Sequence, residues 1–322
     1  MATDVGAYRR AEGIQDAHAG DLDQLTIVSG HAIGLIDDDP SGATIGLEIF
    51  VFEDSAIQDQ RLKALADKIR AEGVAVKVTR RDFRAVPIMP LRRPAAEQAA
   101  LVQDRTDVFN PIVGGISCGP DVSIIWAPWS GTLGLVVHRV DKGVDGLLSN
   151  QHVMYYDAAT KSVTQPARCD SILNYKAGDG LVALRENITF EKRATYVDCA
   201  VASVSAERTA TRKSVFGIGA TITGVKKLKD LRIGDKVVKS GLRTGVTHGV
   251  IRYLSASDPE AKNQIAIEGS TGLFADSGDS GSVVLCGTEI IGLLWGTIND
   301  AGHDYAMVSP IEAVFEALKL QL

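Results

Sequence analysis

Short apolar runs separated by glycine, aspartate and asparagine fill the chain from residue 112 onward. Each run has the length of a strand and is bounded by turn residues, as in TLGLVVHRV, YVDCAVASV, NQIAIEG and SVVLCG. About a dozen such runs predict a mainly β fold, either a sandwich or a pair of barrels. Residues 310–318 differ, because Ile311, Val314, Phe315 and Leu318 recur at helical spacing and predict a terminal helix.

The first third of the chain has a mixed pattern. Residues 1–24 are polar without a strong period, and we expect an arm or a short helix there. Residues 31–36 and 43–52 flank the turn-like DDDPSG and predict a hairpin, and the alternation over 74–78 predicts another strand. With a helix between them, these strands predict a small α+β domain over residues 25–90.

The helix of that domain has recognisable ends. Ser55 and Gln58 have the spacing of a capping box, and Gly73 stands where a helix-terminating glycine belongs. The apolar positions that share one helical face are Leu62, Leu65 and Ile69. Prolines 87, 90 and 94 then break the chain, so residues 91–111 are expected to link the small domain to a second one over 112–322.

Composition excludes several functional classes. The 322 residues are 45% hydrophobic and 23% charged, with a net charge of −6 and dispersed Lys and Arg, which does not favour nucleic-acid binding. No apolar run approaches the roughly 18 residues of a membrane span, and no signal peptide is recognisable. The scattered cysteines are not spaced as metal ligands and are expected to be reduced: Cys118, Cys169, Cys199 and Cys286. We expect a cytoplasmic protein without cofactor, metal, membrane or nucleic-acid partner, with homo-oligomerisation left open.

The stretch Gly278–Val284 reads GDSGSVV and raises the question of chemistry. Its residues suit a tight turn before a strand, but they equally suit a nucleophilic serine on a strained loop. A serine nucleophile needs an imidazole to take its proton and a carboxylate to orient that imidazole. Among the six histidines, His152 follows a predicted strand directly and lies on a loop of the β-rich half. Asp198 lies inside the apolar run YVDCAVA, where a buried carboxylate needs a partner.

The stretches LLSNQHV, YVDCAVA and SGDSGSVV, in this order, resemble the trypsin-like (chymotrypsin-fold) serine proteases over residues 112–322. FRA at 83–85 and VGGIS at 113–117 are similar to the intracellular bacterial and plant branch, in which a small domain precedes the protease. The resemblance implies two six-stranded antiparallel β-barrels and a C-terminal helix. It further implies a serine endopeptidase acting on protein or peptide substrates through His152, Asp198 and Ser280, with the backbone N–H groups of Gly278 and Ser280 as oxyanion hole.

The same resemblance places the substrate pocket between three segments. The residues expected to bind substrate are Phe274, Leu294, Trp295, Gly296 and His303. Trypsin-type specificity needs an acid six residues before the serine, but that position holds Phe274, so we expect a P1 residue that is small, apolar or polar rather than basic. A slip in the loop alignment leaves Asp276 and Asp304 open as alternative acids.

Two further questions stay open in the sequence. The string IVGG at 112–115 matches the cleaved N-terminus of secreted trypsins, but no basic residue precedes it. We therefore expect no processing at Pro111–Ile112, with Asp279 paired locally or with a side chain. The alternatives to a protease are a catalytically inactive protease-fold protein that binds peptides or serves as a scaffold, and a non-proteolytic esterase.

Overall fold

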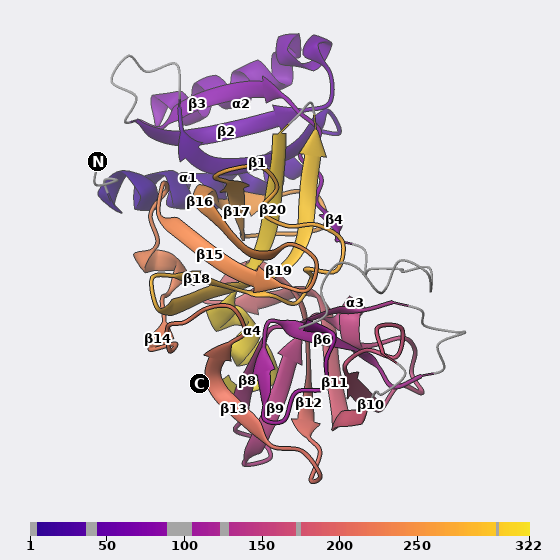
Figure 1. Cartoon of the computed structure of the whole chain (residues 1–322). Helices are drawn as coiled ribbons and strands as arrows, with labels where there is room; N and C mark the ends of the chain where they lie inside the picture. Colours follow the sequence, from indigo (N-terminus) through magenta and orange to yellow (C-terminus); the bar gives the residue numbers. More distant parts are fainter. Residues whose placement is uncertain (1–4, 37–43, 89–104, 123–128, 172–174, 301–302) are drawn as a thin grey trace.

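The computed structural model describes residues 5–36, 44–88, 105–122, 129–171, 175–300 and 303–322, with no side-chain detail at 299, 300 and 303. All but the last residue of the expected run SIIWAPW, and most of the linker expected at 91–111, fall outside these residues. Strands dominate the described part, and four α-helices accompany them (Figure 1).

Six strands close into a barrel in the C-terminal part. In hydrogen-bonded order they are β15 (Lys236–Gly241), β18 (Val283–Cys286), β19 (Glu289–Asp300), β20 (His303–Pro310), β17 (Gln264–Gly269) and β16 (Gly245–Ser257). A second pairing of β16, with β15, closes the ring. The barrel interior is apolar and includes Val284, Leu294 and Val308, none of them measurably exposed.

The preceding sheet is curled without closing. Its order is β21 (Leu320–Gln321), β8 (Leu135–Arg139), β9 (Val144–Ser149), β12 (Arg193–Val204), β11 (Tyr175–Phe190), β10 (Ser162–Gln165), β6 (Ile116–Pro120) and β7 (Gly131–Leu133). The C-terminal helix α4 (Ile311–Leu318) buries Ile311, Val314 and Leu318 in a core shared with this sheet, and Phe315 packs against that core. The expected mainly β fold with a terminal helix is therefore confirmed, and of the two expected barrels one is closed and the other is a curled half-barrel.

Short elements complete the described part. The strand β5 (Ile112–Gly114) pairs in parallel with β13 (Ala210–Val215), and β14 (Gly224–Val225) pairs with β19. The helix α3 (Gln151–Met154) follows β9, and a 3-10 turn occupies Leu228–Asp230.

The N-terminal elements extend the barrel. They are α1 (Val5–Asp23), β1 (Val28–Leu35), β2 (Ile45–Val51), a 3-10 turn η1 (Asp54–Gln58), α2 (Gln60–Ala71), β3 (Ala75–Arg80) and β4 (Val86–Pro87). The expected hairpin is present as β1 and β2, and α2 carries the chain across to β3, which lies parallel to β2. Because β1 pairs with β16, the three strands β1–β3 join the six barrel strands, β4 and β14 in one eleven-stranded sheet (Figure 1). The domain boundaries themselves stay predictions.

Two local predictions need correction. Where an arm or a short helix was expected over residues 1–24, residues 5–23 form a helix of 19 residues. Two of its buried polar side chains, Tyr8 and Gln15, make hydrogen bonds to β16. Gln15 Nε2 donates to the Ser255 carbonyl oxygen at 2.9 Å, and Tyr8 shares a 3.0 Å hydrogen bond with the Ser255 hydroxyl. The N-cap of α2 is Asp59, whose carboxylate accepts two backbone N–H groups, whereas Ser55 donates to Glu53. Gly73 does end α2, with φ +87°.

We expect Leu22→Ala to destabilise the whole chain, since Leu22 of α1 is fully buried in the core that continues into the barrel. The loss should be about 2–5 kcal/mol in the free energy of unfolding, against less than about 0.5 kcal/mol for the exposed control Arg10→Ala. All three tryptophans lie beyond residue 112, so urea unfolding followed by tryptophan fluorescence reports on that part alone. An unshifted fluorescence transition in Leu22→Ala would show that the N-terminal part unfolds independently.

Candidate active site

His152 and Asp198 are brought together by the pairing of β9 with β12. Ser149, the last residue of β9, lies opposite Ala200 of β12, so the chain enters α3 beside Asp198. The carboxylate of Asp198 is fully buried, and its Oδ2 lies 2.7 Å from His152 Nδ1 while Oδ1 accepts the backbone N–H of His152 at 3.3 Å. Asn150 fixes the turn by donating from Nδ2 to the Asp198 carbonyl oxygen at 2.6 Å. This geometry holds the imidazole in one orientation.

A cation that the sequence did not single out faces the same carboxylate. Arg185 lies opposite Asp198 on β11, and its Nε is 3.5 Å from Asp198 Oδ2. The same Nε donates to the Tyr196 hydroxyl at 3.0 Å. Side chains alternate between the two faces of a strand, so residues directly opposite each other in the β11–β12 hairpin lie on the same face. Knowing which residue of β11 pairs with Asp198 would therefore have identified Arg185.

The two glycines around Ser280 are required by their backbone conformation, and Gly281 by close packing as well. Gly278 and Gly281 have φ values of +99° and +92°, which side-chain-bearing residues rarely adopt. A Cβ on Gly281 would lie 2.1 Å from Ser149 Oγ and 2.2 Å from the Thr132 carbonyl oxygen. Thr132 in turn donates its N–H to the Ser280 carbonyl oxygen at 2.9 Å. The turn therefore seats Ser280 against the curled sheet that carries His152.

The backbone N–H groups of Gly278 and Ser280 are available to a ligand. Within the described residues neither donates a hydrogen bond to a protein atom, whereas the neighbouring N–H groups of Asp279 and Gly281 do. Thr132 Oγ1 donates to the Gly278 carbonyl oxygen at 2.9 Å and fixes that peptide. Two unpaired donors on one turn suit a developing oxyanion.

Asp279 is paired inside the chain. Its fully buried carboxylate lies 3.0 Å from Lys239 Nζ, which is equally buried on β15. Four further donors reach it: the backbone N–H groups of Asp276, Arg243 and Thr244, and the Thr244 hydroxyl. Burial lowers the pKa of Lys239, although the charge of Asp279 opposes that shift. The N–H of Ile112 meanwhile donates to the Thr209 carbonyl oxygen, so Asp279 has both a local and a side-chain partner without a new N-terminus.

The expected pocket walls are buried where the structure describes their side chains. The side chains of Phe274, Leu294 and Trp295 are buried, and the Trp295 indole donates to Gln264 Oε1 at 2.7 Å. Gly296 lies on β19, where it pairs with Pro87 of β4. His303 begins β20 opposite Asp300, and its side chain lies outside what the structure describes.

Ser280 and His152 meet at an atom that sequence reasoning missed. The Ser280 hydroxyl donates to the Ile88 carbonyl oxygen at 2.9 Å, and His152 Nε2 lies 3.1 Å from the same oxygen. The two predicted residues, 128 positions apart, thus face one point, Ser280 from the turn before β18 and His152 from α3. The sequence around Ile88 has no pattern that predicts this contact, because the contact depends on the tertiary path of the chain.

The cysteines have no such arrangement. All four are free thiols, and Cys118, Cys169 and Cys199 are buried. Burial raises the pKa of Cys118 to about 12 and also raises that of Cys199. Thiols of this kind are poor nucleophiles.

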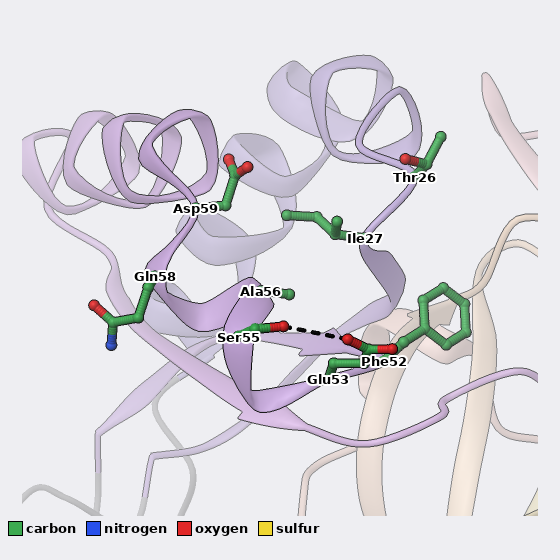
Figure 2. Close-up of a pocket in the computed structure, with 8 residues that line it drawn as sticks. All are labelled: Thr26, Ile27, Phe52, Glu53, Ser55, Ala56, Gln58 and Asp59. Atoms are coloured by element: carbon green, nitrogen blue, oxygen red, sulfur yellow. Dashed lines mark hydrogen bonds between the residues drawn. The ribbon is translucent and has the colours of Figure 1, made fainter.

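A separate hollow lies on the N-terminal part and shows no comparable chemistry. Figure 2 shows its lining residues: Thr26, Ile27, Phe52, Glu53, Ser55, Ala56, Gln58 and Asp59. Ser55 donates to Glu53 at 3.2 Å across it.

None of the helices in the described part is both long and apolar enough to cross a membrane.

No protein-family model and no curated protein matches the sequence. Solved structures do resemble the chain at low identity. A chymotrypsin from Cellulomonas bogoriensis matches with a TM-score of 0.45 and 17% identity, over 66% of this chain and 97% of its own. Protease A from Thermobifida fusca gives 0.45 and 18%, over 66% and 97%. A glutamic acid specific serine protease gives 0.48 and 17%, over 66% and 100%. These matched structures are serine proteases.

We expect Lys239→Met to destabilise the chain by about 3–5 kcal/mol, because it leaves the buried Asp279 carboxylate without its cation. The turn that holds Gly278 and Ser280 should loosen as well. Lys236→Gln, an exposed change on the same strand, is the control and should stay within about 0.5 kcal/mol. Denaturant unfolding measures both, and equal stability of the two variants would contradict the assigned role of the ion pair.

Proposed function

We propose that the chain is a serine endopeptidase. The observation that carries the proposal is the convergence of Ser280 and His152 on one carbonyl oxygen, with Asp198 hydrogen-bonded behind the imidazole. An ordered acid, imidazole and hydroxyl are the parts that acyl transfer requires. The free N–H groups of Gly278 and Ser280 add the donors for the oxyanion.

In this mechanism the Ser280 oxygen attacks the carbonyl carbon of the scissile peptide. His152 Nε2 takes the hydroxyl proton and gives it to the leaving amine, while the Asp198 carboxylate holds the Nδ1–H side of the ring and stabilises the imidazolium. The acyl-enzyme ester is then hydrolysed by water, with His152 again acting as base, which releases a carboxylate and restores Ser280. No cofactor enters these steps.

The first test is covalent labelling of the serine. The protein should react with a fluorophosphonate probe and cleave peptides, and Ser280→Ala should lose both activities. Asp198→Asn should keep the fold but lower kcat by about 10⁴-fold, because the amide favours the wrong imidazole tautomer. Retained peptide cleavage in Ser280→Ala would refute the mechanism.

One alternative function is compatible with the same contacts. A protease-fold protein that binds peptides without cutting them would show the same backbone pairing between β4 and β19. Such a protein would bind peptides but would not react with the fluorophosphonate probe, even after β4 is displaced from the site. The proposed enzyme would react with the probe. Parallel assays on amide and ester substrates separate an endopeptidase from an esterase.

We expect the cleavage preference at P1 to be small, apolar or polar, not basic. Phe274 stands six residues before Ser280 and is 2% exposed, so the position that would need a carboxylate for basic side chains is filled by an apolar ring. Profiling with a proteome-derived peptide library measures the preference. Dominant cleavage after Lys or Arg would mean that Asp276 or Asp304 supplies a charge to the pocket.

A further inference from the structure

We propose that residues 83–88 are a built-in occupant of the substrate groove, so that the intact chain is held in a blocked state until this segment is displaced. The inference deepens the proposed function and rests on it for its consequence, the loss of activity. The blocked geometry itself rests on contacts of the described residues alone.

The segment binds as an added strand. Val86 and Pro87 of β4 pair antiparallel with Thr297 and Gly296 of β19, and the Ile88 N–H donates to the Trp295 carbonyl oxygen at 3.0 Å. Main-chain pairing of this kind is how an extended peptide attaches to a sheet edge, largely independent of its sequence. The segment therefore uses the β19 backbone groups that a peptide in this groove would need.

The close approach depends on a missing side chain. A Cβ on Gly296 would lie 2.8 Å from the Val86 carbonyl oxygen, so only glycine lets the two backbones pair without a shift. The same opening would admit the backbone of a substrate. Occupant and substrate thus require one and the same space.

The end of the segment neutralises both reactive groups. The Ile88 carbonyl oxygen accepts a hydrogen bond from the Ser280 hydroxyl, and His152 Nε2 faces that oxygen instead of the serine. The oxygen of the peptide, rather than its carbon, is turned toward the nucleophile, which is an arrangement for binding and not for attack. The Ile88 side chain is 4% exposed and belongs to the same apolar core as Phe274 and Ala275.

The other end of the segment is fixed to the body of the protein. The Phe83 ring stacks on Phe50 with centroids 3.9 Å apart and meets Tyr253 edge-on. The Ala85 N–H donates to Asp258 Oδ2 at 2.7 Å. These anchors lie upstream of β4 and aim the following residues along β19.

The decisive experiment measures access to position 280 without relying on catalysis. The introduced thiol of Ser280→Cys is alkylated with iodoacetamide, and its rate is followed by peptide mass spectrometry with Ile88 intact and with Ile88→Asn. A buried polar side chain should weaken the segment, so we expect the rate to rise about tenfold or more as the open state becomes populated. The control Val86→Thr changes an isosteric side chain that is 55% exposed and should leave the rate unchanged.

A second variant guards against misfolding. Ile88→Pro removes the N–H that donates to the Trp295 carbonyl oxygen. Circular dichroism and thermal unfolding test whether Ile88→Asn and Ile88→Pro are still folded. Equal alkylation rates in folded Ile88→Asn, Ile88→Pro and the intact segment would overturn the proposal. Purified wild type cut after Ile88, with Ser280→Ala intact, would also overturn it, because the segment would then be a substrate.

An activity arm separates the two proposals. With Ser280 in place, Ile88→Asn should raise both fluorophosphonate labelling and peptide cleavage about tenfold or more. Suppose that Ile88→Asn speeds alkylation of the thiol introduced at position 280, but that neither the wild type nor Ile88→Asn with Ser280 in place reacts with the probe or cleaves peptides. This result would support the blocked groove and refute the peptidase. Labelling that is equally fast with and without Ile88→Asn would support the nucleophile and refute the block.

Discussion

The charge of Asp279 has to be neutralised inside the protein, and the candidate site is arranged around that requirement. An isolated carboxylate at this depth would cost several kcal/mol. Lys239 supplies the opposite charge from β15, and backbone N–H groups from residues 243, 244 and 276 complete the coordination. These partners tie the barrel to the turn 276–282. The same turn contains Gly278 and Gly281, whose positive φ values direct the chain on either side of Ser280.

A second constraint is the shared strand β16. It closes the barrel with β15 and also pairs with β1, so the N-terminal strands are placed by backbone hydrogen bonds rather than by a flexible tether. Polar side chains of α1, such as Gln15, end on the same strand. This attachment fixes where β3 ends and brings β4 alongside β19.

Sequence reasoning reached the parts of the molecule whose signals are local. Strand runs, the C-terminal helix, Gly73 and the order of His152, Asp198 and Ser280 could all be read from short stretches, because each stretch carries its own chemistry or period. Lys239, Arg185 and Ile88 could not be found in that way. Each acquires its place from a partner that is 13 to 192 residues distant, Asp198 for Arg185 and Ser280 for Ile88. The helix α1 was underestimated for the same reason, since its buried polar residues have partners only in the folded chain.

The Ile88 contact connects two parts of a single polypeptide, and this determines how the block responds to its surroundings. A separate inhibitor dissociates when the solution is diluted, whereas a tethered segment keeps the same effective concentration at every protein concentration. Lowering the amount of protein therefore cannot release Ser280. Release requires a ligand, a partner or a proteolytic cut that acts on the chain itself. The groove would therefore open in response to such an event and not to a change in protein concentration.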